Sequence, residues 1–398
     1  MLKGKTVVLA VTGSIAAYKI ANLARMLKKS GCNVHVLMTQ NATNFINPIA
    51  FESLLSNKCL VDTFDRNFQY SVEHVAIAKQ ADVVLVAPAS ANVIGKIANG
   101  IADDMLTTTV MACPCKKIIA PAMNHNMLHN PIVQDNIEKL KKFGYEIIES
   151  DRGMLANGDI GDGRMPDESV LLSYILKEIA CEKDLKGKKI LVTAGATREA
   201  IDPVRFITNH SSGKMGIAIA EAAMLRGADV TLVKAHTDVD APLFVNTVNV
   251  TSAEDMFNAV CEYSDNADFI IKAAAVADYT PVTVADNKMK KSDGDLKIEL
   301  KRTKDILKYL GENKKSGQII CGFSMETENV VENSRKKLVS KNCDMICANS
   351  IKEKGAGFGS DTNIITLITA EGDEELPMIS KKEASHIILD RLIDLKNN

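Results

Sequence analysis

The sequence of 398 residues has no tryptophan, and aromatic side chains make up only 5% of it. Sites for single-stranded nucleic acid depend on aromatic rings for stacking, so this scarcity argues against such a role, and equally against stacking on sugars. The sequence also has no excess of charge of one sign, because 48 Lys and Arg stand against 50 Asp and Glu, a formal net charge of −2. This balance disfavours a general binder of nucleic acid or of anionic membranes.

Long apolar runs are absent as well, since none approaches the roughly 20 residues of a membrane-spanning helix. Residues 1–5 lead directly into a strand-like segment, so we expect no signal peptide. Nine cysteines are too few for a disulfide-built chain of this length, and their odd number prevents complete pairing. We therefore expect reduced thiols and a cytoplasmic protein.

Several nucleotide and metal motifs are missing. Neither half has G-x-G-x-x-G after its first strand-like segment or a G-x-x-x-x-G-K-[ST] phosphate loop, which argues against a standard dinucleotide site and a P-loop enzyme. His125 and His129 are four residues apart, but Asn126 stands where H-E-x-x-H requires glutamate. Cys113 and Cys115 have no second cysteine pair at zinc spacing, so we expect no structural metal.

The sequence does contain a regular alternation of apolar, β-rich runs with helical patterns. In the first half we expect strands at 6–11, 34–39, 82–87 and 117–120, and helices at 15–29, 74–80, 91–98, 103–112, 126–142 and 167–181. After a charged linker at 181–189 we expect strands at 189–193, 229–233, 269–271, 318–322 and 345–348, and helices at 213–226, 252–264, 326–341 and 381–396. Apolar strands between helices are typical of a parallel sheet covered on both faces. The sequence therefore predicts an α/β protein with two tandem three-layer domains, residues 1–181 and 187–398.

Small and polar residues follow the expected strands of the first half, at the sheet edge where open α/β folds bind ligands. Gly13 and Ser14 open a helix whose free N–H groups suit a phosphate, although an ordinary helix cap is the alternative explanation. Ser90 and Asn92 follow the third strand among small residues that would admit a flat ring, with the same alternative. Residues 157–165 contain three glycines and Arg164, and this segment is expected to be a mobile loop that could serve as a lid.

Four segments together carry a family resemblance: PASAN at 88–92, PAMNxxM at 121–127, His74 within Val-Glu-His-Val, and GDIGDGRMP at 158–166. From about residue 4 to 181 the chain resembles the homo-oligomeric flavin-containing cysteine decarboxylases, and within them the phosphopantothenoylcysteine decarboxylases. The resemblance implies a flavodoxin-like or Rossmann-like fold with FMN. Oxidation of the substrate's thiol side to a thioaldehyde then provides the electron sink that loss of CO₂ requires.

The resemblance also implies residue roles. His74 would be the acid–base residue, whereas without the resemblance a lone histidine at a helix start is a surface or capping residue. Asn124 would hold the substrate carboxylate. The residues implied to bind FMN are Gly13, Ser14, Ile15, Thr39, Ser90, Ala91, Asn92, Thr107 and Met123.

One position departs from the family pattern. In the coenzyme A branch a cysteine usually precedes Gly-Asp-x-Gly and is expected to protonate the ene-thiolate and help return electrons from the reduced flavin, but this sequence has Asn157. An amide is no practical proton donor and has no redox chemistry. Three interpretations stay open: a natural variant with another donor, an engineered or trapped form, and an activity that stops at the oxidised ene-thiol.

The second half has features suited to a nucleotide. Ser211, Ser212 and Gly213 precede a helix and offer N–H groups and hydroxyls to an anion, with a well-capped helix as the alternative. Asp278 follows an alanine-rich strand end and suits ribose or Mg²⁺. A basic stretch begins at Lys288 and is either a solvated face or a loop that folds over polyphosphate.

Three segments of this half, ITNHSSGKMG at 207–216, Ala-Asp-Tyr at 277–279 with Lys-x-Lys-Lys at 288–291, and residues 343–349, resemble the phosphopantothenate–cysteine ligases from about 187 to 398. The resemblance implies a Rossmann-like ligase fold that uses CTP and Mg²⁺, and only the resemblance favours CTP over ATP. Asn209 would hold an acyl-cytidylate, Lys288 the phosphates and Asp278 the metal. The residues implied to bind nucleotide are Gly195, Ser211, Ser212, Gly213, Ala273, Ala274, Asp278, Lys288, Phe323, Lys337 and Lys341.

Both resemblances together imply a bifunctional cytoplasmic enzyme. It would join 4′-phosphopantothenate to L-cysteine with CTP and then decarboxylate the product to 4′-phosphopantetheine, with no nucleic-acid or membrane partner. The families suggest a homo-oligomer, a dodecamer built from trimeric N-terminal and dimeric C-terminal contacts. Two alternatives stay open: an intact ligase with a flavin domain that stalls at the ene-thiol, and a non-catalytic flavoprotein regulatory subunit.

Overall fold

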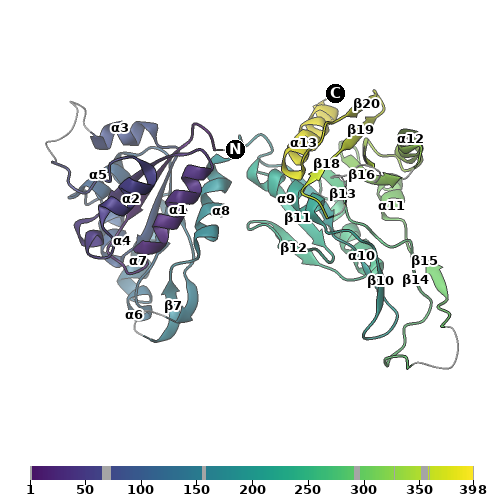
Figure 1. The fold of residues 1–398 in the computed structure, drawn as a ribbon, viewed down its shortest axis with the longest axis horizontal. Helices are drawn as coiled ribbons and strands as arrows, with labels where there is room; N and C mark the ends of the chain where they lie inside the picture. Colours follow the sequence, from purple (N-terminus) through teal and green to yellow (C-terminus); the bar gives the residue numbers. More distant parts are fainter. Residues whose placement is uncertain are drawn as a thin grey trace. The chain divides into compact units, whose positions relative to one another are not determined.

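The computed structural model describes residues 2–64, 73–154, 158–290, 296–326, 328–350, 357 and 359–397. The chain divides into two compact units, Met1–Cys181 and Glu182–Asn398, each with its own central sheet (Figure 1). Within the described residues, no helix has both the length and the apolar character needed to cross a membrane.

The first unit alternates strands and helices along most of its length. Its elements are β1 (Thr6–Val11), α1 (Ala17–Lys29), β2 (Asn33–Met38), the 3-10 helix η1 (Gln40–Asn44), α2 (Pro48–Leu55), α3 (Glu73–Gln80), β3 (Val83–Ala89), α4 (Ala91–Ala98), α5 (Met105–Ala112), β4 (Lys116–Pro121), α6 (His125–Leu128), α7 (Pro131–Lys142), β5 (Glu146–Ile147), β6 (Asp151–Met154), β7 (Ile160–Arg164) and α8 (Glu168–Ile179).

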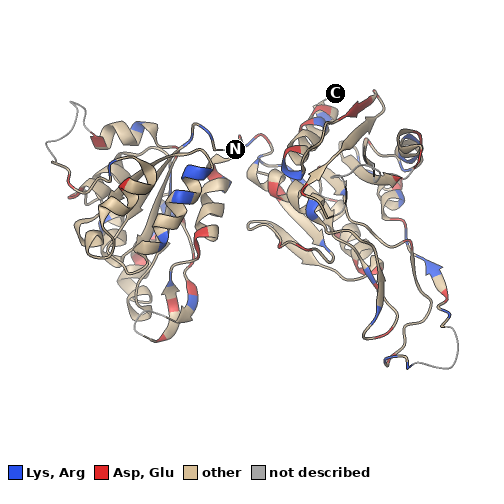
Figure 2. Ribbon diagram, viewed as in Figure 1, with Lys and Arg blue, Asp and Glu red and all other residues tan. Residues whose placement is uncertain are grey.

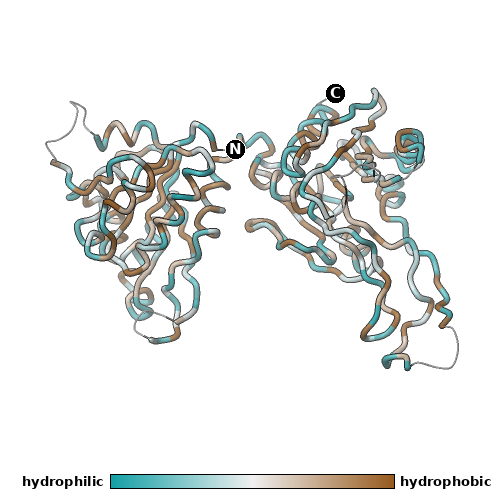
Figure 3. Tube along the Cα trace, in the orientation of Figure 1, coloured by the Kyte–Doolittle hydropathy of each residue, from teal (hydrophilic) through white to brown (hydrophobic). Residues whose placement is uncertain are grey.

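Strands β2, β1, β3, β4 and β5 lie in that order in one parallel sheet. Every residue of β1 and β3 is buried, because helices cover both faces of the sheet. Side chains alternate between the faces, so Val7 and Leu9 pack with α1, α2 and α8, while Val8 and Ala10 pack with α3, α4, α5 and α7. Figure 3 shows the resulting apolar strands between partly polar helices.

The second unit contains a larger sheet. Its elements are β8 (Lys189–Ala194), β9 (Arg198–Ala200), β10 (Phe206–Thr208), α9 (Lys214–Leu225), β11 (Asp229–Lys234), β12 (Asn246–Asn249), α10 (Ala253–Ser264), β13 (Phe269–Lys272), β14 (Tyr279–Pro281), β15 (Leu300–Arg302), α11 (Ile306–Glu312), β16 (Ile319–Glu326), α12 (Val330–Ser340), β17 (Met345–Ser350), β18 (Thr362–Asn363), β19 (Ile365–Thr369), β20 (Asp373–Glu375), β21 (Ile379–Ser380) and α13 (Lys381–Asn397).

The order in this sheet is β12-β11-β8-β13-β16-β17-β19-β20, parallel as far as β17 and antiparallel at β19 and β20. Helices α10, α11 and α12 share one core with the sheet, while α9 contacts β8, β11 and α13. The edge strand β20 is acidic throughout (Figure 2), which discourages pairing with another chain. The predicted α/β class is thus confirmed for both units.

Two predicted helices are wrong in their extent. The helix expected at 126–142 is interrupted, because Asn130 caps α7 through a hydrogen bond from the Ile132 N–H and Pro131 occupies its first turn. The helix expected at 326–341 begins late, because β16 continues to Glu326 and α12 starts only at Val330. The sequence analysis also missed the short elements, among them α2, α11 and the β6–β7 ribbon.

Candidate functional site

The carboxyl ends of β1 and β3 are tied together by one side chain. The Thr12 hydroxyl donates to the carbonyl of Pro88 at 2.5 Å and accepts from the N–H of Ser90 at 2.9 Å. Strands β1 and β3 are also where the strand order 2-1-3-4-5 reverses direction along the chain. In flavodoxin-like sheets this switch point is where a ligand binds.

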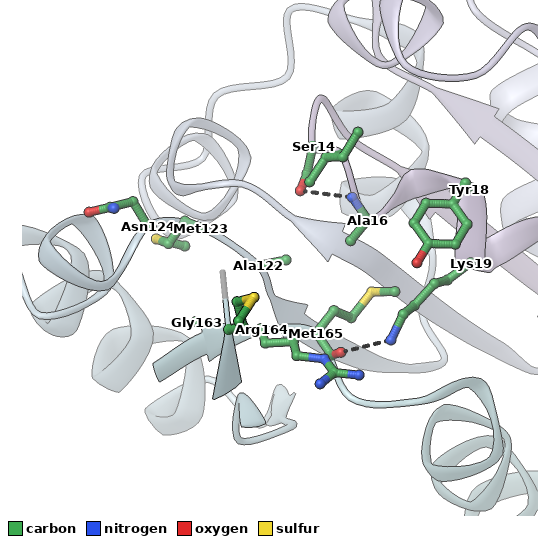
Figure 4. Close-up of a pocket in the computed structure, with 12 residues that line it drawn as sticks. Ser14, Ala16, Tyr18, Lys19, Ala122, Met123, Asn124, Gly163, Arg164 and Met165 are labelled. Atoms are coloured by element: carbon green, nitrogen blue, oxygen red, sulfur yellow. Dashed lines mark hydrogen bonds between the residues drawn. The ribbon is translucent and has the colours of Figure 1, made fainter. Parts of the chain in front are cut away.

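A cavity of about 410 Å³ opens at this edge, with walls from three segments (Figure 4). The start of α1 forms one wall, the loop after β4 a second, and the end of β7 with the residues that follow a third. The lining residues are Ser14, Ile15, Ala16, Tyr18, Lys19, Ala122, Met123, Asn124, Met154, Gly163, Arg164 and Met165.

The β7 wall is fixed against the β4 wall by backbone contact. The N–H of Met123 donates to the carbonyl of Gly163 at 3.1 Å. Gly163 has a φ of +116°, and a Cβ atom there would lie 2.2 Å from the carbonyl oxygen of Met123. Only glycine therefore permits this close approach of the two walls.

One cation, Lys19, and a helix start without a side-chain cap lie on the α1 side of the cavity. Helix α1 has no side-chain cap at its start, and Ser14 accepts only a long 3.4 Å hydrogen bond from the Ala16 N–H. The ammonium of Lys19 reaches the carbonyl of Met165 at 3.4 Å and the carboxylate of Asp167 at 2.8 Å. Apolar side chains at 122, 123 and 165 line the rest. A flat, largely apolar ring with an anionic tail fits this combination, because the helix start favours negative charge.

Asn124 lines the cavity and also caps the helix that follows it. Its Oδ1 accepts from the N–H of Asn126 at 2.9 Å and so caps α6. The amide NH₂ has no hydrogen-bond partner among the residues that the structure describes, which leaves it for a carboxylate.

The cavity brings together some of the expected FMN residues and not others. Ser14, Ile15, Met123 and Asn124 line it, and Gly13 directly precedes it. Other expected hydroxyls serve local caps: Thr39 accepts from the Ala42 N–H at the start of η1, Ser90 from the Val93 N–H at the start of α4, and Thr107 forms a capping box with Asp104 in α5. Ala91 and Asn92 form the first turn of α4.

His74 does not line this cavity. His74 lies half-buried on α3, at the upper margin of the unit in Figure 1, whereas α6 lies at the lower margin. Asn157 lies outside the described residues. Lys19 and Arg164 line the cavity but were not among the predicted site residues. Arg164 stands in the glycine-rich segment that is expected to form a lid. Lys19 lies within an amphipathic helix, where its local sequence does not mark it as a site residue.

The second unit has two adjoining pockets, of about 330 and 470 Å³, at the carboxyl edge of its sheet. Both are lined by Lys272 and Val276 from the end of β13, by Asp278, and by Phe323 of β16. These shared residues make the pockets neighbours, with room for a ligand in two parts.

The smaller pocket faces the start of α9. Its wall includes Asn209, whose amide donates to the Ala275 carbonyl at 3.3 Å, and the predicted residues Ser211, Ser212, Gly213, Ala273 and Ala274. Gly195 lies just behind this pocket and has a φ of +89°. A Cβ atom at this position would lie only 2.3 Å from the carbonyl oxygen of His236 and would clash with it. The β8 turn therefore requires glycine in order to pass under this pocket.

The larger pocket is rich in cations held by acidic partners. Lys337 pairs with Glu326 at 2.7 Å, and Lys341 pairs with Asp305 at 2.5 Å. The hydrogen bond from Lys337 lowers the pKa of Glu326, so this carboxylate remains charged beside its partner.

Lys272 differs from these two lysines because it has no hydrogen-bond or ion-pair partner within the described part of the chain. Burial lowers the pKa of Lys272, although the nearby carboxylates of Asp305 and Asp278 act in the opposite direction. It stands where the two pockets meet, ready for an anionic group. Lys272 was not among the predicted site residues, although its place at the end of a buried strand suggests a residue at the binding edge of the sheet.

Lys288 is exposed and lines neither pocket. Asp278, Phe323, Lys337 and Lys341 do line the larger pocket, as the resemblance implied. Thr303 and Asp305, which were not predicted, complete its rim, and the Thr303 hydroxyl donates to the carbonyl of Ala277 at 2.7 Å.

Comparison with known proteins gives a consistent result over the whole chain. A family model described as "Flavoprotein" matches residues 1–180, and one described as "DNA/pantothenate metabolism flavoprotein C-terminal domain" matches residues 185–395. The chain is 48% identical over 399 residues to the coenzyme A biosynthesis bifunctional protein CoaBC of Bacillus subtilis (strain 168), covering 99% of this chain and 98% of that protein. It is 41% identical over 393 residues to the protein of the same name from Vibrio vulnificus (strain CMCP6), with 98% of each covered.

A crystal structure of the C-terminal domain of a coenzyme A biosynthesis bifunctional protein CoaBC is 48% identical, covers 54% of this chain and 98% of that one, and has a TM-score of 0.47. The bifunctional enzyme expected from the sequence, with decarboxylase and ligase activities, is confirmed by the full-length relatives and the two family models. They favour neither the stalled flavin domain nor the non-catalytic regulatory subunit. The chain belongs to the family of the coenzyme A biosynthesis bifunctional proteins CoaBC.

Proposed function

We propose that the second unit joins 4′-phosphopantothenate to L-cysteine at the expense of CTP and that the first unit decarboxylates the product to 4′-phosphopantetheine. One observation carries the proposal. Each unit opens a pocket at the carboxyl edge of its parallel sheet, the first with a largely apolar lining beside a helix start and the second with a cluster of lysines. The first chemistry suits a flavin and the second a nucleoside triphosphate.

In the ligase reaction the carboxylate of 4′-phosphopantothenate attacks the α-phosphorus of CTP. The new bond gives an acyl-cytidylate, and the broken α–β bond releases pyrophosphate. The cysteine amine then attacks the acyl carbon and CMP leaves. Developing charge on the phosphates needs fixed cations, which Lys272, Lys337 and Lys341 supply in the larger pocket.

Roles for the remaining ligase residues follow from the resemblance. Asn209 would hold the acyl-cytidylate through its amide, and Asp278 would carry Mg²⁺ between the two pockets. Lys288 would reach the phosphates only if its exposed side chain turns toward the pockets, because it lines neither.

In the decarboxylase reaction the chain binds and orients the substrate and handles protons. When bound, FMN supplies the two-electron oxidation of the substrate's thiol side that makes loss of CO₂ possible. The start of α1, with Gly13, Ser14 and Ile15, would hold the flavin phosphate, and the Asn124 amide would hold the substrate carboxylate. Asn157 stands at the position of the usual proton donor, so another group must supply that proton.

His74 would act on a substrate bound to a neighbouring subunit. Within one chain it lies on α3 and does not line the cavity. In a flavin site shared between subunits, as the resemblance implies, His74 of one subunit would reach the cavity of another. We infer a homo-oligomer, a dodecamer with trimeric contacts between N-terminal units and dimeric contacts between C-terminal units.

We further infer that the enzyme works in the cytoplasm. All nine cysteines lie in the described residues and none forms a disulfide, although the sulfurs of Cys321 and Cys347 lie only 3.6 Å apart. Nine thiols without a disulfide suit a reducing compartment.

A mass-spectrometric time course tests the proposal. The purified protein receives 4′-phosphopantothenate, cysteine and Mg²⁺ with CTP, and ATP replaces CTP in a parallel sample. We expect phosphopantetheine to accumulate with CTP. A product lighter by two hydrogens would show that the reductive step fails at Asn157, and phosphopantothenoylcysteine that keeps its carboxylate would refute the decarboxylase. Absence of any ligated product would refute the ligase, and equal rates with ATP would refute CTP specificity.

A further inference from the structure

A cluster of three potential metal ligands lies beside the flavin cavity without lining it. His125 is the first residue of α6, His129 caps the end of the same helix, and Asp162 lies in the middle of β7. Asp162 is 33 residues from His129 in the sequence, so no local motif joins the three.

The three side chains already face one another. Nε2 of His129 lies 3.1 Å from Oδ2 of Asp162, and Nδ1 of His125 lies 3.9 Å from the same oxygen. One ligand atom from each residue falls within 4.8 Å of the others, and the two imidazole centroids are 4.3 Å apart. Zn²⁺ bonds of about 2.0–2.2 Å at tetrahedral angles separate donor atoms by about 3.3–3.6 Å. Small side-chain shifts therefore convert the cluster into three ligands of one ion.

A simple hydrogen bond between His129 and Asp162 does not account for the whole cluster. Nδ1 of His125 is buried and has no hydrogen-bond partner in the described part of the chain. Gly161 packs closely against this ring, because a Cβ added there would lie 3.1 Å from His125 Cβ and Cγ. A buried ring nitrogen without a partner, 3.9 Å from a carboxylate oxygen, is a position that a cation would complete.

We propose that His125, His129 and Asp162 bind a divalent transition-metal ion of intermediate hardness, and we expect Zn²⁺ to bind best. Two imidazole nitrogens and one carboxylate oxygen form a ligand set that suits Zn²⁺ better than Mg²⁺ or Ca²⁺. The side chains are 44%, 52% and 39% exposed, so an ion can enter and water can complete its coordination.

The ion has a structural consequence. It ties α6, which begins after Asn124, to β7, which carries Gly163 and Arg164. Two walls of the cavity thus become joined through a metal in addition to the Met123–Gly163 hydrogen bond. The inference rests on these side chains alone and does not depend on either proposed reaction.

Calorimetric titration of the flavin-containing full-length protein with ZnCl₂ in a non-chelating buffer tests the site. We expect one saturable Zn²⁺ per chain. His129→Gln and Asp162→Asn should each weaken binding by at least about tenfold, the lower end of what even indirect damage to metal sites causes. His35→Gln and Asp135→Asn are matched controls in the same unit, and they should leave the titration unchanged.

Two further measurements keep the result interpretable. Far-ultraviolet circular dichroism and retained flavin colour show whether a variant is folded. Hydrogen exchange measured with and without Zn²⁺ should show greater protection of 158–164 in the wild type and no change in Asp162→Asn. The proposal is overturned if the wild type shows no saturable binding, if the variants bind as it does, or if Zn²⁺ protects other segments only.

Discussion

The carboxylate of Asp202 accepts a hydrogen bond from the backbone N–H of Met289 at 3.2 Å, joining two segments that are 87 residues apart. The same carboxylate accepts from the guanidinium of Arg205 at 2.9 and 2.6 Å and from two backbone N–H groups of its own turn. Arg205 holds the pKa of Asp202 well below its usual range, so the anchor stays charged at any physiological pH. Arg205 also donates to the Met289 carbonyl at 3.2 Å, which fixes the peptide next to Lys288 from both sides.

Asp202→Asn should therefore impair the ligase without contacting its pockets. The neutral amide weakens the Arg205 contact and places an NH₂ where an acceptor is needed, so the Lys288 loop loses its anchor. Because the loop is then no longer held in one position, we expect kcat/KM for CTP to fall by about tenfold. Asp286→Asn, an exposed change in the same loop, serves as control in the pyrophosphate-release assay. Equal rates for both variants would show that the loop position is unimportant.

Lys272→Met should weaken CTP binding, because it removes the one cation that both pockets share. A charge-assisted contact to phosphate is worth about 1.5–3 kcal/mol, which corresponds to about a ten- to hundredfold rise in Kd. Lys308→Met removes a lysine from the exposed face of neighbouring α11 and should leave Kd unchanged. Calorimetry with CTP and Mg²⁺ measures both variants, and an unchanged Kd for Lys272→Met would exclude a phosphate contact.

The lowered pKa of Lys272 also predicts how CTP binding depends on pH. Burial favours the neutral amine in the free protein, so Lys272 loses its proton at a lower pH than an exposed lysine does. Polyphosphate binds the charged form, and affinity should therefore fall as pH rises through this lowered pKa. In Lys272→Arg the side chain stays charged, so the affinity should remain nearly level over the same pH range. Parallel pH profiles for the two proteins would contradict the assignment.

The large buried strands β1, β3 and β8 were predictable from the sequence, because each is a mainly apolar run of strand length. Prediction from the sequence failed where the signal was polar or tertiary. The four residues of β6, Asp-Arg-Gly-Met, show no apolar–polar alternation, and the strand pairs with β7, the next strand along the chain. The hydroxyl of Thr107, which the resemblance assigns to FMN, also takes part in the capping box at the start of its own helix, and the FMN contact stays a prediction.

The site residues follow the same division. Positions immediately after strands, such as Ser14 and Asn124, were predictable because parallel strands end at one edge. Residues that reach the pockets by folding, such as Thr303 and Asp305, were not, because nothing in their local sequence marks them. The position of His74 away from the cavity shows that one chain does not bring all the expected groups together.

Gly163→Ala tests the close contact between the two walls of the flavin cavity. A positive φ costs an alanine roughly 1–2 kcal/mol, and the added Cβ would also lie 2.2 Å from the Met123 carbonyl oxygen, so β7 must move away. Gly158→Ala is the matched control, because Gly158 has a similar φ of +87° but no atom within 4 Å of a Cβ. In urea unfolding we expect both variants to lose a similar part of the free energy of unfolding, because alanine is strained at a positive φ. Only Gly163→Ala should also lose the Met123 hydrogen bond, decarboxylation and part of its flavin. Equal decarboxylation rates in the two variants would mean that the walls need not touch, whereas the ligase rate should be the same in both because the change lies in the other unit.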